Sequence, residues 1–189
     1  MGGAVMSVIR IETERLVLRS WQAEDADAFL VVNSDPEVMA TLGSVMDRDQ
    51  VAALIVRMQG IEAEHGHCFW AMIRREDDRL IGWCGAIRGS VDPIKDKAEI
   101  GWRMARDAWG HGYATEAAAA TLDWLFANRA DDAAWAITTP ANRGSRAVME
   151  RLGMTYLPEL DFDHPRVPDG DPLSRHVTYR ITREQWRTR

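Results

Sequence analysis

A loop with two closely spaced glycines is the part of the sequence best suited to chemistry. Gly110 and Gly112 are separated by one residue, and they lie between a strand-like run, Glu99–Met104, and a long helical pattern. The first backbone amides of a helix have no partner within the helix, and the helix dipole adds about half a positive charge there. Glycines allow the main chain to approach a ligand closely. The segment therefore predicts a site for a phosphate or pyrophosphate.

Two other phosphate-binding patterns are missing from this loop. It lacks the Lys-Ser/Thr ending of a nucleotide P-loop, and Thr115 stands where a dinucleotide-binding fingerprint would have its third glycine. Neither ATP nor NAD is therefore favoured as the ligand. A plain strand-to-helix turn, with glycine present for geometry alone, stays open as the alternative.

Hydrophobic periodicity predicts the elements that must position this loop. Asp47 and Gln50 resemble a capping box at the start of one helix, and Gly153 stands where a left-handed cap would end another. The segment Ser34-Asp35-Pro36 is expected to end the first helix, because Pro disfavours helix in the residue before it. The helices are expected over residues 22–33, 47–66, 112–128 and 142–152, and the strands over residues 15–19, 69–73, 80–87, 99–104, 134–138, 154–157 and 176–181.

This order of elements predicts an α+β domain, a mixed α/β three-layer sandwich. The three strands between residues 69 and 104 are typical of an antiparallel meander, and a strand–helix–strand unit follows from residue 99 to residue 138. Strands outnumber helices and the crossover helices come late, which argues against a doubly wound sheet. No repeat or linker divides the chain, so residues 1–189 are expected to form a single domain, with residues 1–10 disordered or peripheral.

Composition excludes several classes of protein. The chain has 189 residues, of which 46% are apolar, and a formal net charge of −6. Its longest apolar runs are far shorter than the roughly 20 residues of a membrane span, and Met1–Arg10 does not resemble a secretory signal, so we expect a cytoplasmic protein. The excess of acidic residues argues against nucleic-acid binding. Cys68 and Cys84 are expected to be buried free thiols.

The stretch Trp109-Gly-His-Gly-Tyr-Ala-Thr-Glu-Ala117 resembles the acetyl-CoA pyrophosphate loop of the GNAT superfamily of N-acetyltransferases. Further segments, in the same order as in the family, are similar to its ribosomal-protein N-terminal acetyltransferase (Rim-type) branch. The resemblance covers roughly residues 11 to 186. It implies a GNAT-like fold with a mixed, mostly antiparallel sheet that is splayed between its fourth and fifth strands and flanked by about four helices. The similar segments are Glu12–Arg19, Asp35–Val38, Leu80–Gly82, Glu99–Gly101, Asn142–Ser145 and Leu152–Met154.

The resemblance implies that acetyl-CoA, as cosubstrate, enters the gap between the strands Glu99–Met104 and Ala134–Thr138. The amides of residues 108–114 would hold its pyrophosphate, and the first strand would pair with its pantetheine arm. Asp107 stands where the family usually has Gln or Arg, and an acid there suits a pyrophosphate only if it points away. The cofactor-binding residues that the resemblance implies are Ile100, Trp102, Arg103, Met104, Trp109, Gly110, His111, Gly112, Tyr113, Ala114, Asn142 and Ser145.

Direct acetyl transfer requires a neutral amine to attack the thioester and a proton for the departing thiolate. Glu99 is the candidate base, acting through a water, because it opens the strand beside the expected acetyl site; a surface ion pair is its alternative role. Many relatives have a Tyr in the last helix, where this chain has Met149. Ser145 is therefore the candidate acid, with Tyr156 as a more distant option. Ser145 and Asn142 could instead cap the helix that they begin.

Several other residues have a structural explanation beside a functional one. The tryptophans of the expected strands are interpreted as core packing, although Trp21 and Trp83 would also suit a wall of the acceptor pocket. The loops 34–47 and 157–174 are expected to flank the acceptor, and the acids of the second loop could attract a cation or simply lie in solvent. No metal is expected, because no metal-ligand spacing connects the histidines, which are His65, His67, His111, His164 and His176.

One leading hypothesis and two alternatives follow. The expected activity is acetyl transfer to a primary amine, above all a protein or peptide N-terminus. An α-amino group with a pKa of about 7.7 to 8.0 is about a tenth neutral at pH 7, whereas a lysine is only about 0.04% neutral. The alternatives are acetylation of a small amine, such as a polyamine, amino acid or aminoglycoside, and an acyl-CoA-binding sensor without turnover. We expect a monomer or homodimer without a membrane partner.

Overall fold

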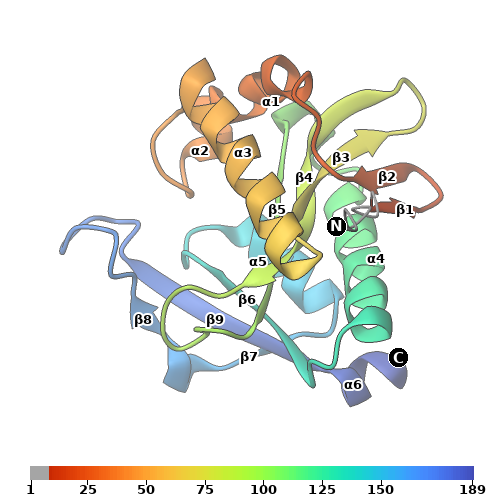
Figure 1. Cartoon of the computed structure of the whole chain (residues 1–189). Coiled ribbons are helices and arrows are strands. Elements are labelled where there is room, and N and C mark those ends of the chain that lie inside the picture. Colours follow the sequence, from red (N-terminus) through yellow and green to blue (C-terminus); the bar gives the residue numbers. More distant parts are fainter. Residues whose placement is uncertain (1–8) are drawn as a thin grey trace, which may run out of the picture.

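The computed structural model describes residues 9–189, in which one large sheet is packed between helices (Figure 1). The helices are α1 (Asp25–Asn33), α2 (Pro36–Met39), α3 (Arg48–His65), α4 (Tyr113–Asn128), α5 (Arg143–Arg151) and α6 (Arg183–Arg187), with the short 3-10 helices η1 (Arg106–Ala108) and η2 (Pro158–Leu160). The strands are β1 (Arg10–Glu12), β2 (Leu16–Arg19), β3 (Phe69–Arg74), β4 (Arg79–Arg88), β5 (Ala98–Met104), β6 (Ala133–Thr138), β7 (Thr155–Tyr156), β8 (Phe162–Asp163) and β9 (Arg175–Thr182).

The sheet has nine strands and a mixed topology. Its strands follow the order β1-β2-β3-β4-β5-β6-β9-β7, and β8 pairs with β9 beside this path. All neighbours are antiparallel except β5 and β6, which are parallel. The strands β3, β4 and β5 form the expected antiparallel meander. The predicted fold class, a mixed and mostly antiparallel α/β fold, is confirmed.

Helices cover both faces of the sheet. Adjacent residues of a strand point to opposite faces, so their contacts show which helix lies on which side. On β4, the Trp83 ring lies 5.5 Å from the ring of Phe29 in α1, whereas Cys84 Sγ lies 3.6 Å from Thr121 Oγ1 in α4. The helices α1 and α4 therefore pack on opposite faces, with α3 against α1, and the fold has three layers.

The sheet opens between β5 and β6. Only the first residues of β5 pair with β6, namely Ala98 with Ala134 and Glu99 with Trp135. Beyond Glu99 the two strands diverge, and β5 continues to pair with β4 alone. These are the two strands that were expected to separate. They are the fifth and sixth strands, rather than the fourth and fifth, because the edge strand β1 precedes them.

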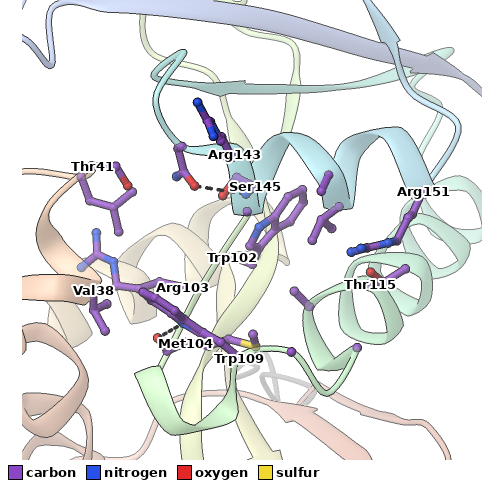
Figure 2. A pocket seen from close by; sticks show the side chains of 18 of the residues that line it. Val38, Thr41, Trp102, Arg103, Met104, Trp109, Thr115, Arg143, Ser145 and Arg151 are labelled. Carbon is purple, nitrogen blue, oxygen red and sulfur yellow. Dashed lines mark hydrogen bonds between the residues drawn. The ribbon is translucent and has the colours of Figure 1, made fainter.

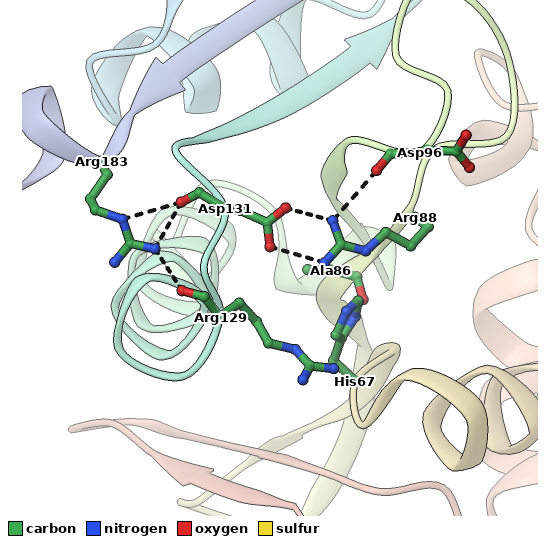
Figure 3. Close-up of polar contacts among 7 residues, drawn as sticks. All are labelled: His67, Ala86, Arg88, Asp96, Arg129, Asp131 and Arg183. Atoms are coloured by element: carbon green, nitrogen blue, oxygen red, sulfur yellow. Dashed lines mark hydrogen bonds and ion pairs between the residues drawn. The ribbon is translucent and has the colours of Figure 1, made fainter.

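An arginine–aspartate pair ties together the closed end of this opening (Figure 3). Arg88, the last residue of β4, donates from Nη1 and Nη2 to the Asp131 carboxylate at 2.5 and 3.0 Å. Asp131 lies in the turn between α4 and β6, and its carbonyl oxygen accepts from Arg183 Nη2 of α6 at 2.8 Å. These contacts join β4, α4, β6 and α6 at the end where β5 and β6 still pair.

Four short elements, β1, α2, β8 and α6, lie where the sequence patterns assigned no helix or strand. The segment 34–47 was expected to be a loop, but its first part contains α2. Pro36 disfavours helix in the residue before it and is itself the first residue of α2, which Asp35 caps by accepting from Glu37 N at 2.8 Å. The described residues therefore contain six α-helices, two of them very short, instead of about four.

The strongest local signals of the sequence are confirmed. Asp47 and Gln50 form a capping box at the start of α3. Gly66 and Gly153 follow helices and have left-handed φ angles of 73° and 72°. One face of the predicted helix α4 is buried, with the residues Ala114, Ala117, Ala118, Thr121, Leu122 and Leu125.

The expectation for residues 1–10 falls mainly on residues 1–8, which lie outside the described residues. Arg10 belongs to the edge strand β1. The buried apolar side chains of residues 9–189 form a connected core, and the single-domain organisation stays a prediction for the whole chain. No helix in that range is long and apolar enough to cross a bilayer.

Candidate active site

A cavity of about 990 Å³ lies beside the second half of β5, where β6 no longer pairs with that strand (Figure 2). It is lined by the second half of β5, by the loop and first turns of α4, by one side of α5 along its length, and by α2 with the turn that follows it. Nine of the expected site residues line this cavity: Trp102, Arg103, Met104, Trp109, Gly110, Gly112, Ala114, Asn142 and Ser145.

The other four expected residues have side chains outside the lining. Ile100 and Tyr113 are buried in the core. His111 stacks on Tyr113, with 5.6 Å between ring centroids, and its carbonyl oxygen accepts from Arg15 Nη1 at 2.9 Å. These three residues could contact a cofactor only through the main chain. The fourth is Glu99, which lies at the closed end of the opening.

The loop before α4 leaves the first amides of that helix without a side-chain partner. Gly110 and Gly112 have φ angles of 79° and 81°, which residues with a Cβ rarely adopt, and among residues 9–189 no side chain caps α4. The helices α3 and α5 are, by contrast, capped by the side chains of Asp47 and Asn142. We call this loop and first turn the α4 wall of the cavity, with the lining residues Trp109, Gly110, Gly112, Ala114 and Thr115. An anion suits the position of the missing cap.

Asp107 does not face the cavity as an unpaired acid. Arg79 Nη1 and Nη2 donate to its carboxylate at 2.5 and 3.1 Å. This pairing holds the pKa of the Asp107 carboxyl group below its usual value. The acid is therefore neutralised by β4, and it lies outside the cavity lining.

Glu99 is placed where β5 and β6 still pair, just before the strands diverge. Burial raises the pKa of its carboxyl group to about 7, against the opposing charge of Arg166. Within residues 9–189 the carboxylate of Glu99 forms no ion pair, so the alternative of a surface ion pair is not realised. A carboxyl group with a pKa near 7 can accept a proton at neutral pH. Because the side chain is outside the lining, it would reach the cavity through a water.

The start of α5 combines capping with an open hydroxyl group. Asn142 Oδ1 accepts from Ser145 N at 3.1 Å, so Asn142 is the helix cap (Figure 2). The cap uses the amide of Ser145, and the Ser145 side chain lines the cavity. Met149 is buried, and the Tyr156 hydroxyl group donates to Asp161 Oδ2 at 2.6 Å outside the lining. Of the two candidate acids, only Ser145 borders the cavity.

The side of the cavity opposite the α4 loop comes from α2 and the turn after it. We call this side the α2 wall, with the lining residues Glu37, Val38, Thr41 and Leu42. Both loops were expected to flank the acceptor; the loop 34–47 borders the cavity, whereas the loop 157–174 contributes no lining residue. Trp21 and Trp83 are buried outside the lining, in agreement with the core interpretation.

Two cations of α5 were not among the expected site residues. Arg143 and Arg151 line the cavity, and in Figure 2 the Arg151 side chain points toward the α4 wall. Their positive charge favours a phosphate-bearing ligand. Arg143 is adjacent to the predicted site residue Asn142, so the sequence contained a signal for it. Arg151 had no such signal, because only the packing of α5 against α4 brings it to the cavity.

The sequence matches the family described as "Acetyltransferase (GNAT) domain" over residues 15–155. The chain belongs to the GNAT acetyltransferases. It is 32% identical over 148 residues to the uncharacterized protein YkkB of Bacillus subtilis, an alignment that covers 78% of this chain and 86% of YkkB. The acetyltransferase (GNAT family) from Bacillus anthracis superposes with a TM-score of 0.77 at 26% identity, over 93% of this chain and 99% of that structure.

A structure of RimL, the ribosomal L7/L12 alpha-N-protein acetyltransferase, in complex with coenzyme A also has this fold. Its TM-score is 0.76 at 14% identity, over 94% of this GNAT chain and 99% of RimL. GNAT acetyltransferases use acetyl-CoA, and this enzyme has uncapped helix amides, glycines and cations where a pyrophosphate would lie. Within residues 9–189, no group of three or more His, Cys, Asp or Glu could hold a metal ion.

Proposed function

We propose that this GNAT enzyme transfers acetyl from acetyl-CoA directly to the α-amino group at the N-terminus of a protein or peptide, as Rim-type enzymes do. The observation that carries the proposal is the position of Glu99. Its partly buried carboxyl group, with a pKa near 7, belongs to the last residue of β5 that pairs with β6, and the cavity with its open helix amides begins beyond that point of the strand.

The pKa of Glu99 favours an α-amino group over a lysine. Moving a proton from an ammonium group with a pKa of about 8 to a base with a pKa of about 7 is uphill by about one unit, or about 1.4 kcal/mol. The same transfer from a lysine, with a pKa of about 10.4, is uphill by more than three units. A base of this strength is therefore matched to an amine that is already partly neutral.

The residues of the cavity suggest a division of roles in binding. The amides from Gly110 to Ala114 would bind the pyrophosphate, with Arg143 and Arg151 adding positive charge. The free edge of β5 beyond Glu99 would pair with the pantetheine arm, since β6 no longer occupies that edge. The acceptor would then approach along the α2 wall.

Acetyl-CoA supplies an acetyl group activated as a thioester. The amine nitrogen forms a bond to the acetyl carbon as the carbon–sulfur bond breaks. Glu99 takes one proton of the ammonium group through a water before the attack, and the second proton that the nitrogen loses passes to solvent as the amide forms. Ser145 gives the departing thiolate a proton and regains one from solvent. The products are an amide, coenzyme A and one proton, which Glu99 holds until solvent takes it.

Acetylation of a small amine and binding without turnover are the other candidate functions. A thiol-release assay separates them, with acetyl-CoA as donor and a panel of N-terminal peptides, polyamines, amino acids and aminoglycosides. Coenzyme A release with peptides supports the proposal. Release with small amines alone contradicts the N-terminal assignment, and no release across the panel favours the sensor.

Binding is measured first by thermal shift, with ATP and NAD as controls. Acetyl-CoA at 100 times its dissociation constant adds about 2.7 kcal/mol of stability, which raises Tm by roughly 5 to 10 °C for a chain of this size. A shift with acetyl-CoA alone is the expected result. No shift at millimolar ligand would contradict the assigned cofactor site.

A further inference from the structure

Arg103 is a cation of the cavity lining that forms no ion pair with any residue from 9 to 189. Its Nη1 donates to Asn33 Oδ1, and its guanidinium carbon lies 4.9 Å from the centre of the Trp83 ring. Its Nε is buried and has no hydrogen-bond partner. Burial lowers the pKa of Arg103 to about 10, which still leaves the guanidinium protonated at pH 7.

The acids that line the same cavity are already paired with other arginines. Glu37 Oε1 lies 2.7 Å from Arg106 Nη1, and Glu116 Oε2 lies 2.6 Å from Arg15 Nη2. Neither carboxylate is therefore free to neutralise Arg103. The described part of the enzyme provides this guanidinium with a neutral amide and an aromatic face, but no counter-ion.

Asn33 holds Arg103 in place without neutralising it. Asn33 is fully buried at the end of α1, and its Nδ2 donates to the carbonyl oxygen of Phe29 at 2.7 Å. That bond leaves Oδ1 directed to Arg103. A neutral acceptor orients the guanidinium but offsets little of the free energy lost when a charge leaves water. Arg103 is therefore held in position to form an ion pair with an anionic group of a ligand.

The guanidinium faces the α2 wall and not the α4 wall. Figure 2 shows it directed toward Val38 and Thr41, away from Thr115 and Arg151. In the sheet Arg103 is opposite Trp83, which packs on α1, so the side chain lies on the α1 face. The pyrophosphate loop opens α4, which packs on the other face, and pantetheine carries no charge. An anion at Arg103 is therefore placed to come from the second substrate rather than from the pyrophosphate or the pantetheine arm.

We propose that Arg103 binds a carboxylate of the acceptor, so that the acceptor is an amine which also carries an acidic group. This inference rests on the proposed acetyl transfer and narrows its substrate class. A guanidinium can bind a carboxylate through two parallel hydrogen bonds, which gives both affinity and orientation. The acidic group is either the α-carboxylate of a free amino acid or an acidic side chain near a peptide N-terminus.

Matched acceptor pairs test the proposal and separate the two sources. One arm compares free amino acids with their carboxamides, and the other compares C-terminally amidated peptides with Glu or Gln as second residue. In the wild-type enzyme, kcat/KM is expected to be at least about 10-fold higher for the acidic member in one arm, because a site built for a hydrogen-bonding group rejects analogues that lack it. The arm that shows the preference identifies the source.

The ratio within a pair is the readout in variants, because it cancels any effect on the cofactor site. Arg103→Gln is expected to bring the ratio close to 1. Arg103→Lys keeps the charge but cannot form the bidentate pair of hydrogen bonds, so a kcat/KM ratio between those of the wild type and Arg103→Gln is expected. Equal rates within every wild-type pair, or a preference that survives in Arg103→Gln, would overturn the proposal.

Asn33→Asp provides a second test that keeps Arg103 itself, in case Arg103→Gln fails to fold. The new carboxylate lies beside the guanidinium and supplies an internal counter-ion, so the preference for acidic acceptors is expected to fall. An unchanged preference in Asn33→Asp contradicts the proposal.

A binding measurement separates failure of this inference from failure of the proposed function. With coenzyme A present, the rise in Tm caused by N-acetyl amino acids is compared with the rise caused by their carboxamides. The same comparison is made between the N-acetylated peptides with Glu and with Gln as second residue. Stronger stabilisation by the carboxylates, lost in Asn33→Asp, supports the role of Arg103 even if no amine is acetylated. Equal stabilisation by both members of every pair overturns that role.

Discussion

The α4 wall and the α2 wall of the cavity are built from different parts of the chain. The α4 wall provides main-chain amides at a helix start, held by two glycines with left-handed φ angles. The α2 wall provides side chains from a four-residue helix and the turn after it, with Arg103 directed toward them. In the function proposed above, cofactor binding follows from the path of the backbone, whereas acceptor choice depends on individual side chains and their charges.

Replacing Glu99 tests whether proton transfer and cofactor binding by the α4 wall are independent. Of the substitutions proposed here, it has the largest expected effect on kcat. Glu99→Gln removes the base but keeps its size, so kcat is expected to fall by roughly 100-fold to 1,000-fold while acetyl-CoA affinity is kept. Steady-state kinetics and calorimetric titration measure the two quantities. Glu150→Gln, on the exposed side of α5, is the matched control and is expected to behave as wild type. Loss of acetyl-CoA binding in Glu99→Gln would show that the base and the α4 wall are not separable.

The pH profile gives the same test a second readout. Glu99 accepts a proton only when ionised, and its pKa is near 7, so activity is expected to rise as the pH increases through 7. In Glu99→Gln that limb disappears and only the ionisation of the acceptor amine is left. A wild-type profile that is flat around pH 7 contradicts the assigned base.

Variants of Ser145 and Asn142 distinguish a catalytic role from a structural role at the start of α5. The cap uses the Ser145 amide, so Ser145→Ala keeps it, and we expect kcat to fall by about 10-fold with stability unchanged. Asn142→Ala removes the cap and is expected to lower the free energy of unfolding by about 1 kcal/mol. Rate measurements and thermal unfolding distinguish the two variants. An unchanged kcat in Ser145→Ala would mean that solvent protonates the thiolate.

The two walls also differ in how far the sequence predicts them. The capping box of α3 and the glycine loop were predicted, because each depends on a local pattern of a few adjacent residues. The strands that separate were expected only because the family resemblance implies a splayed sheet. The helix α2 was missed, since Pro36 was interpreted only as the end of α1 and not as the first residue of a new helix. The pairing of Arg79 with Asp107 and the lack of a counter-ion at Arg103 depend on tertiary contacts, which no local pattern contains.

Replacing Gly112 at the start of α4 tests the α4 wall, and replacing Gly60 inside α3 is its control. The two substitutions are expected to change stability in opposite directions. Gly112 has a φ angle of 81°, so Gly112→Ala introduces backbone strain of about 1 to 2 kcal/mol and displaces the amides. We expect about 5-fold weaker acetyl-CoA binding and a lower Tm. At Gly60 an added methyl group would meet only open space, so Gly60→Ala is expected to add about 0.5 to 1 kcal/mol of stability without affecting binding. Unchanged acetyl-CoA affinity in Gly112→Ala would remove this loop from the cofactor site.

The ion pair of Arg79 and Asp107 has the smallest expected effect on the α4 wall. Both side chains are partly exposed, so solvent screens the pair, and Arg79→Gln is expected to weaken acetyl-CoA binding by only about 2-fold to 3-fold. The cause would be the freed Asp107 carboxylate close to the pyrophosphate loop, and the loss should shrink as salt is added. Calorimetric titration at two ionic strengths measures it.

The variant Asp107→Asn shows whether Arg79 affects acetyl-CoA binding by neutralising Asp107 or by interacting with the ligand directly. If Arg79 acts only by neutralising Asp107, then Arg79→Gln has no effect on acetyl-CoA affinity once Asp107 has been replaced by Asn. If Arg79→Gln weakens binding equally in both backgrounds, Arg79 interacts with the phosphates themselves. The α4 wall would then recognise its ligand partly through a side chain of β4, and its contrast with the α2 wall would be one of degree.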